Sequence, residues 1–296
     1  TNLGIKGGSN KLSYLVQASL VDNKDFNTPD GEVENTYFKN SDLKFGLGYT
    51  SDNFISDLRV NINDSEIGIP HGEENHDDHD EDDHDDDDHD EDHDEDHEEH
   101  EEEKSYQDLT NTMISWKNRF LFENRSEIEF TLGFSSNKRK EFGHHEEEGH
   151  DDHDDDDHDD DHDDHDKHGE GPTLNMDLET TTFDLKYIFP KSEKLELVFG
   201  TNILSQTNTN YGEEELIPDA DKRDFGVYAL SHIHASKWDV LIGLRTDNRK
   251  ITTSDFDKNY NSLNASLGFK RDVSTNKICR LNFSNGYRAP NLSELF

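Results

Sequence analysis

The sequence LKFGLGY, residues 43–49, places Leu43, Phe45, Leu47 and Tyr49 at every second position. Successive side chains of a β-strand point to opposite faces, so this spacing puts the four apolar side chains on one face. A lysine and two glycines occupy the positions between them. The stretch therefore predicts a strand with one apolar face and one polar face.

The same period of two recurs along nearly the whole chain of 296 residues. Including a short opening strand near residues 2–6, about twelve segments show it. The others are residues 12–20, 43–49, 58–62, 112–122, 128–134, 183–189, 195–203, 225–233, 238–244, 263–269 and 281–283. No segment approaches the ~18–20 apolar residues that a membrane helix needs. The pattern predicts an all-β, antiparallel fold.

The connections between these segments alternate between short and long. The short ones are residues 7–10, 51–53, 123–126, 190–194, 235–237 and 271–276, and the long ones are 22–36, 64–106, 136–173, 205–221 and 247–260. Every long loop is thus predicted at one end of the sheet, as in an outer-membrane β-barrel with short periplasmic turns and long extracellular loops. A soluble β-sandwich also alternates, but its loops do not sort by length and its strands are usually only ~5–6 residues long.

Aromatic residues near the predicted strand ends suit the girdles that such barrels carry at the membrane interface: Tyr49, Phe134, Tyr187 and Trp238. Apolar side chains would face lipid and polar ones the lumen. The fold class that we predict is therefore an antiparallel transmembrane β-barrel.

Two tracts of acidic residues and histidines, residues 71–103 and 144–170, interrupt this pattern inside two of the long loops. They hold 39 of the 71 acidic residues and 16 of the 18 histidines, so the net charge of −42 lies almost entirely in them. Such charge runs cannot bury a core, and we expect two disordered extracellular loops.

Histidines recur every three to five residues in most of each tract, with carboxylates between them. Imidazole nitrogen together with carboxylate oxygen suits Zn²⁺, and also Ni²⁺, Co²⁺ or Cu²⁺. With one cysteine and two methionines in the chain, the soft ligands that Cu(I) prefers are scarce. We therefore interpret all sixteen tract histidines as candidate metal ligands forming several weak, overlapping sites: His71, His76, His79, His84, His89, His93, His97, His100, His144, His145, His150, His153, His158, His162, His165 and His168.

Other interpretations of the tracts stay open. Ca²⁺ prefers oxygen ligands, but the sequence has no EF-hand loop and calcium gives no reason for the histidines. The tracts would otherwise be inert solvated segments or a docking site for a basic partner. If they bind a transition metal, protons compete for the imidazoles, so binding should weaken as the pH falls from about 7 to 5.

The last eleven residues, GYRAPNLSELF at 286–296, carry a more specific signal. With the preceding strand they resemble a barrel segment of TonB-dependent outer-membrane receptors. The resemblance implies a 22-stranded barrel preceded by a plug domain and a TonB box; about twelve of those strands are recognisable here, but neither the plug nor the box. We therefore interpret residues 1–296 as a partial barrel domain from inside a longer receptor, with Arg288 and Glu294 as structural hydrogen-bonding residues.

The resemblance also implies a function and a location. It implies a multi-pass receptor in the outer membrane of a Gram-negative bacterium. The composition of the tracts adds the expected cargo, a divalent transition metal with Zn²⁺ as the transported ligand, and we expect no cofactor. The expected partners are the TonB–ExbB–ExbD complex, reached through the missing N-terminal part, outer-membrane lipid and the metal ion, but no nucleic acid. The alternatives are a receptor for a siderophore, heme or cobalamin, and a surface barrel that buffers metal without transport. No nucleophile elbow or paired catalytic carboxylates are recognisable, so we expect no enzyme.

Two histidines lie outside the tracts, at positions 232 and 234. They share the strand face opposite Phe225, Val227 and Ile233, so both should point into the lumen. They would form a relay along the transport path, or simply be polar lumen residues near a periplasmic turn, which we favour. The lone Cys279 cannot form an internal disulfide and is predicted to be a packing residue.

Overall fold

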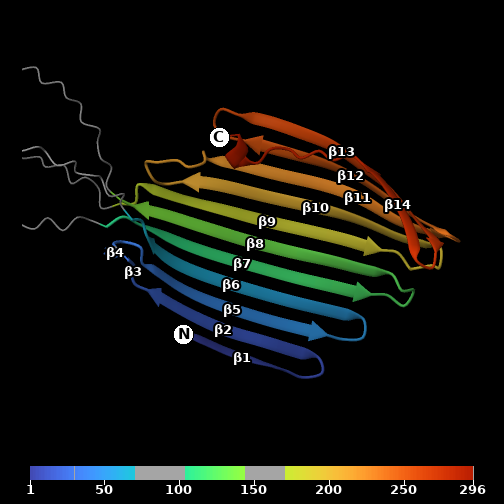
Figure 1. Cartoon of the computed structure of the whole chain (residues 1–296), viewed down its shortest axis with the longest axis horizontal. Coiled ribbons are helices and arrows are strands. Elements are labelled where there is room, and N and C mark those ends of the chain that lie inside the picture. The colour runs from blue at the N-terminus through green and yellow to red at the C-terminus, as the bar shows by residue number, and fades with distance from the viewer. Residues whose placement is uncertain (30, 71–103, 144–170, 296) are drawn as a thin grey trace, which may run out of the picture.

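The structure is a computed structural model that describes residues 1–29, 31–70, 104–143 and 171–295. Both histidine- and acid-rich tracts lie outside the described residues. Twelve strands form one antiparallel sheet in which neighbours in sequence are neighbours in space, and two more, β3 and β4, form a separate hairpin (Figure 1). No helix among the described ranges is long and apolar enough to cross a membrane.

The strands of the sheet are β1 (Asn2–Gly8), β2 (Leu12–Asn23), β5 (Phe38–Thr50), β6 (Phe54–Gly68), β7 (Tyr106–Leu121), β8 (Glu127–Phe142), β9 (Leu174–Ile188), β10 (Leu195–Asn210), β11 (Ala220–Ala235), β12 (Trp238–Thr252), β13 (Asp257–Ser274) and β14 (Lys277–Ser284). The hairpin consists of β3 (Phe26–Thr28) and β4 (Gly31–Val33), and a short 3₁₀-helix η1 (Leu292–Glu294) lies near the C-terminus. Ten strands of the sheet have 12–18 residues, well above the ~5–6 typical of soluble domains. The predicted all-β architecture of about twelve strands is confirmed, and the sheet is open between β1 and β14.

The connections sort by length onto two ends of the sheet, as predicted. The short-turn end carries residues 9–11, 51–53, 122–126, 189–194, 236–237 and 275–276, and the long-loop end carries 24–37, 69–105, 143–173, 211–219 and 253–256. The last two loops are much shorter than the predicted ranges 205–221 and 247–260. Their flanking residues continue the ladder, with Asn210 paired to Met176 and Thr252 paired to Asp257. Backbone hydrogen bonds extend the strands beyond the apolar band, where the sequence pattern fades.

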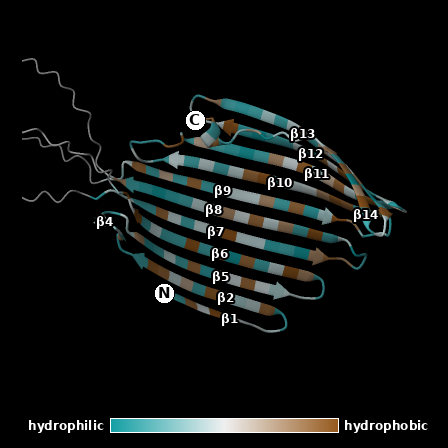
Figure 2. Cartoon of the chain, viewed as in Figure 1, coloured by the Kyte–Doolittle hydropathy of each residue, from teal (hydrophilic) through white to brown (hydrophobic). Residues whose placement is uncertain are grey.

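Large apolar side chains on one face of the sheet are exposed, with no second layer over them among the residues that the structure describes. Leu43, Phe45 and Leu47 are 47%, 38% and 43% exposed. Figure 2 shows hydrophobic and hydrophilic residues alternating along the strands. Only five apolar residues are buried among the described residues, all near the long-loop end or under the C-terminal segment. A soluble sandwich would cover this face with a second sheet, so the exposed face fits a lipid environment.

Aromatic rings gather near the short-turn end of the apolar face. Phe54 and Phe120 have ring centroids 4.6 Å apart, and Tyr187 and Phe189 are also 4.6 Å apart. Tyr49, Tyr187 and Trp238 lie at or next to the ends of their strands, in agreement with the predicted girdle. Phe134 was wrongly assigned to it: this residue lies in the middle of β8, because the strand continues to Phe142.

The C-terminal segment, residues 285–295, folds back over the other face of the sheet (Figure 1). Arg249 Nη1 donates to the carbonyl oxygens of Ala289 and Pro290 at 3.1 and 3.0 Å. Leu292 packs against Ala220 and Ile251 in a small buried cluster. The segment is therefore attached by both a charged clamp and apolar contacts.

Arg288 and Glu294 make the hydrogen bonds that their structural interpretation requires. Arg288 Nη2 donates to Glu294 Oε1 at 2.5 Å, and the Asn291 backbone N–H donates to Glu294 Oε2 at 2.9 Å. These bonds hold the pKa of Glu294 below its usual range. The packing role predicted for Cys279 is wrong, because its side chain is exposed on β14, the last strand of the sheet.

Candidate functional site

Both histidine- and acid-rich tracts leave the sheet at its long-loop end. The first tract connects β6 with β7, and the second connects β8 with β9 (Figure 1). All sixteen predicted metal ligands fall within residues 71–103 and 144–170, so the structure places none of their side chains. The structure does describe the residues that flank each tract, and we call these flanking residues the base of the tract.

The end of the first tract and the start of the second are neighbours. Tyr106 and Phe142 are paired across β7 and β8, and their rings stack with centroids 4.6 Å apart. A Cβ atom added at Gly143 would lie 2.8 Å from Ser105 Oγ. The chain therefore enters and leaves the two tracts at adjacent points of the sheet edge.

Asn35 closes the base of the first tract. Its Nδ2 donates to the carbonyl oxygens of Ile69 and Ser105, at 2.6 and 2.7 Å, and the residue is only 3% exposed. Its backbone lies in the left-handed region with φ of 57°, which asparagine tolerates better than most residues. The sequence alone did not reveal this clamp, because nothing local distinguishes Asn35 from any other loop asparagine.

Tyr37 belongs to the same base. The Gly68 backbone N–H donates to its carbonyl oxygen at 3.0 Å. Burial, together with a hydrogen bond to the Glu66 carboxylate, raises the pKa of the Tyr37 phenol to about 12. The phenol therefore stays protonated at any physiological pH.

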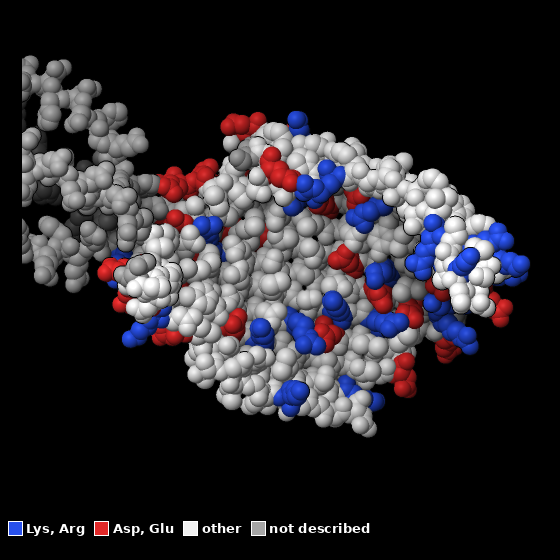
Figure 3. Space-filling model, in the orientation of Figure 1, with Lys and Arg blue, Asp and Glu red and all other residues white. Residues whose placement is uncertain are grey.

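The face opposite the apolar one carries a continuous polar network. On β5 to β8, Asn63 Nδ2 donates to Asn40 Oδ1 at 2.7 Å and to Asp42 Oδ1 at 2.9 Å, and Asn137 Nδ2 donates to Asn111 Oδ1 at 2.5 Å. Figure 3 shows positive and negative side chains interspersed over the face of the sheet turned to the viewer. Such a face suits a water-filled lumen.

An interior cavity of about 750 Å³ lies between β9–β13 and the C-terminal segment. Arg245, Arg249 and Arg288 contribute to its lining. Arg249 is tied bidentately to Asp224, at 2.8 and 2.6 Å, and Arg245 Nη1 donates to Asn202 at 2.8 Å. The lining also includes Asp184, Asp224 and Asp247, and the three arginines are ion-paired with Asp247, Asp224 and Glu294 respectively. The cavity therefore presents a polar wall of fixed, paired charges.

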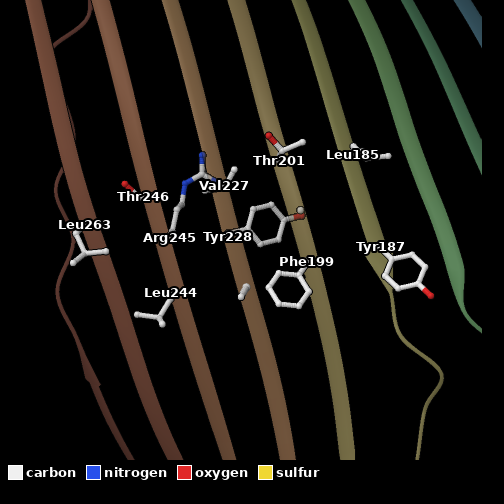
Figure 4. A pocket seen from close by; sticks show the side chains of 12 residues that line it. Leu185, Tyr187, Phe199, Thr201, Val227, Tyr228, Leu244, Arg245, Thr246 and Leu263 are labelled. Atoms are coloured by element: carbon white, nitrogen blue, oxygen red, sulfur yellow. The ribbon is translucent and has the colours of Figure 1, made fainter.

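A second cavity, of about 500 Å³, is lined largely by side chains of the apolar face (Figure 4). Phe199, Val227, Leu244 and Leu263 supply much of its wall. Apolar walls on the lipid side suit acyl chains and offer no ligands for an ion. We assign this cavity no part in cargo binding.

His232 and His234 lie on the polar face, as predicted, and the structure adds Glu196 beside them. Glu196 on β10 is paired with His232 on β11, and one ligand atom from each of Glu196, His232 and His234 lies within 4.8 Å of the others. Among the described residues this is the one group with the composition and spacing of a metal site. The sequence showed the two histidines on one face, but it did not show the β10–β11 register that brings Glu196 opposite them.

The profile of the family described as "TonB dependent receptor-like, beta-barrel" matches residues 6–296. The chain belongs to this family. No curated protein sequence matches the chain. The resemblance seen in the C-terminal motif is thereby confirmed, and so is the location expected from it, the outer membrane of Gram-negative bacteria.

Solved structures of receptors and transporters share the fold. The FrpB iron transporter from Neisseria meningitidis (F3-3 variant) superposes with a TM-score of 0.68 at 12% identity, over 98% of this chain and 44% of that one. The copper transporter OprC gives 0.64 at 11% identity, over 100% and 45%. The siderophore receptor PirA from Pseudomonas aeruginosa gives 0.60 at 12% identity, over 98% and 40%. The chain thus spans less than half the length of these three receptors.

Proposed function

We propose that this chain is part of a TonB-dependent outer-membrane receptor that takes up a divalent transition metal, with zinc as the favoured ion. The two histidine- and acid-rich tracts would capture the ion outside the cell. The observation that carries the proposal is the composition of the tracts, sixteen histidines set among 39 acidic residues within two loops of one receptor barrel. No resident cofactor is needed for this role, and no catalytic chemistry enters it.

The placement of the tract bases supports joint action. Both tracts leave the long-loop end, and Ser105 beside Gly143 brings the end of one next to the start of the other. Two weakly binding segments fixed at adjacent points have a high effective concentration for each other, which strengthens shared binding without any new contact. An ion held by ligands from both tracts would therefore be retained longer than by either alone.

The charge of the tracts would attract cations, and the imidazole ligands would select among them. The carboxylates attract all cations over about one Debye length, ~8 Å at physiological salt. The imidazoles then select, because Mg²⁺ and Ca²⁺ prefer oxygen ligands while Zn²⁺ accepts nitrogen readily. The captured ion would pass into the polar lumen below, with energy supplied through the TonB–ExbB–ExbD complex acting on the remainder of the receptor.

A second candidate cargo is an anionic metal chelate, such as a ferric siderophore. The observation that favours it is the interior cavity of about 750 Å³, whose polar lining would hold a larger cargo than a bare ion. Its arginines, Arg245, Arg249 and Arg288, would have to exchange their carboxylate partners for the chelate. The iron transporter and the siderophore receptor among the similar structures are in line with this choice. Under this alternative the tracts would have a secondary role. A surface barrel that buffers metal without transport is the third possibility.

Growth of a strain that lacks the receptor separates these candidates. The strain would carry the whole receptor, a variant with the sixteen tract histidines changed to asparagine, or an empty vector. Under zinc chelation we expect the wild-type receptor to restore growth and the asparagine variant to fail. Rescue under iron limitation by both receptors alike, with no effect under zinc chelation, would support the chelate cargo and refute zinc uptake. Zinc bound at the cell surface without any growth advantage would indicate a buffer.

A further inference from the structure

We propose that Glu196, His232 and His234 form a second metal site, for a divalent transition ion such as Zn²⁺, on the interior face at the short-turn end of the sheet. His234 is followed after one residue by the turn at 236–237, so the site lies at the opposite end of the strands from the tracts. Its binding of metal does not depend on the proposed function. Only its role in transport, as the last site that the ion would occupy inside the barrel, rests on that function.

The ladder of β10, β11 and β12 brings the ligands together. Glu196 and His232 are directly paired, and His234 lies two residues further along β11, on the same face. Neighbouring strands lie ~4.7–4.9 Å apart, so side chains of this length on one face reach a common point. The rings of His232 and His234 are 4.0 Å apart between centroids, and His234 Nε2 lies 3.8 Å from Glu196 Oε1.

Asp239 orients one of the ligands. Its Oδ1 lies 2.7 Å from His234 Nδ1 and therefore accepts the proton of that nitrogen. This bond fixes the tautomer in which Nε2, the nitrogen facing Glu196, carries the free lone pair. Lys270 Nζ, 3.2 Å from Asp239 Oδ2, holds the carboxylate in place. A carboxylate behind a ligating histidine is the usual arrangement in zinc sites.

His232 supplies an independent reason for a ligand. Its Nε2 is buried and has no hydrogen-bond partner among the described residues, and the nearest carboxylate oxygen, Asp239 Oδ1, is 3.8 Å away. Unpartnered buried polar atoms are rare because each forfeits its hydrogen bond to water. A metal ion bound at this nitrogen would give the imidazole a partner.

The geometry describes an open site rather than a closed structural one. Zinc bonds to nitrogen and oxygen are ~2.0–2.2 Å long, so ligand atoms up to 4.8 Å apart must move closer by about an ångström. The three side chains are 33–35% exposed, and that exposure allows both the movement and a fourth ligand from solvent. Lys191, which pairs with Glu196 at 3.0 Å and is 68% exposed, is free to swing away. Three protein ligands with an open position suit an ion that is exchanged.

Anomalous diffraction at the zinc edge tests the site in place, because it separates this ion from any bound by the tracts. Crystals of the whole receptor equilibrated with ZnCl₂ should show a peak between Glu196, His232 and His234. The double variant His232→Ala/His234→Ala should lose it. Asp239→Asn should weaken zinc binding ~10–100-fold, the range for second-sphere partners of zinc ligands, seen as reduced occupancy at limiting zinc. Glu129→Gln, a carboxylate on the same face that pairs with Lys186, should leave the peak unchanged.

Absence of a peak at saturating zinc, or a peak that survives the double alanine variant, would overturn the site. The outcome is independent of the proposed function. Zinc uptake lost with the tract histidines, but without a peak here, would leave the function standing and remove the inner site. A peak at this site without any growth advantage under zinc chelation would support the inner site and refute the proposed zinc uptake.

Discussion

Replacing Asn35 should loosen the base of the first tract while the rest of the sheet stays intact. Asn35 Nδ2 is the donor to two carbonyl groups, those of Ile69 and Ser105, on opposite sides of the tract. Asn35→Gly removes both hydrogen bonds but accepts the left-handed backbone at φ of 57°. Asn35→Ala removes the same bonds and adds the strain of a Cβ atom in that region. The pair of variants therefore separates hydrogen bonding from backbone strain.

The expected magnitudes follow from these contacts. Each intramolecular hydrogen bond contributes ~0.5–1.5 kcal/mol net, so Asn35→Gly should lower the free energy of opening the base by ~1–3 kcal/mol. The left-handed conformation costs an alanine a further ~1–2 kcal/mol. Since 1.4 kcal/mol is a factor of ten, opening should become about 5- to 140-fold more frequent in the glycine variant and more frequent still in the alanine variant.

Hydrogen exchange measured by mass spectrometry on the whole receptor in detergent reads this opening directly. The reporters are the amides of Gly68 and Ile69, which donate to Tyr37 and Ser105 at 3.0 Å each. Their protection should fall by the factors above, while amides in the middle of β10 keep theirs. Unchanged protection at Gly68 and Ile69 in both variants would refute the idea that Asn35 holds the base closed.

Three further predictions address other parts of the molecule. Arg249→Gln should release residues 285–295 from the sheet and speed their cleavage in limited proteolysis. Arg249→Lys should have a smaller effect, because it keeps the charge but loses the bidentate pair with Asp224. Equal cleavage rates in the wild type and in Arg249→Gln would contradict the role of Arg249 in holding the segment. Hydrogen bonds hold the pKa of Glu294 below its usual range, so the stabilisation by its carboxylate is complete at neutral pH and is lost as the pH falls below ~4.3. Glu294→Gln should therefore lower the melting temperature at pH 7. The difference in melting temperature between the variant and the wild type should become smaller in acid. Zinc retention by the receptor should weaken between pH 7 and pH 5, because protons compete for imidazoles whose ordinary pKa is ~6.5, and calorimetry that found the same affinity at both values would exclude histidine as the ligand.

The sequence predicted the strand segments that would lie inside the apolar layer of the membrane. Alternation such as Leu43, Phe45 and Leu47 marks the strand segment inside the apolar band, because only there must one face be apolar throughout. Outside the band both faces are polar, as at Arg249 and Lys250 on β12, and the pattern fades although the backbone pairing continues to Thr252. The predicted loops were therefore too long, and Phe134 was placed too near an end.

Details of the candidate sites depend on register and on single backbone conformations, which the sequence does not display. Glu196 becomes a candidate ligand only through its pairing with His232, and a shift of one residue would move it to the lipid face. Asn35 becomes a clamp only because its φ of 57° aims the amide at two carbonyl groups contributed from far along the chain. By contrast, the metal chemistry of the tracts depends on composition alone, and it remains a prediction because residues 71–103 and 144–170 lie outside the described part of the chain.

Accumulation of ⁶⁵Zn²⁺ by intact cells at limiting free zinc tests the central claim most directly. Cells that carry the whole receptor should accumulate the label in an energised, TonB-containing strain, and should lose accumulation either without TonB or when the sixteen tract histidines are asparagine. Equal accumulation by the wild-type receptor and the asparagine variant would contradict capture by the tracts, and accumulation that persists without TonB would contradict the transport role.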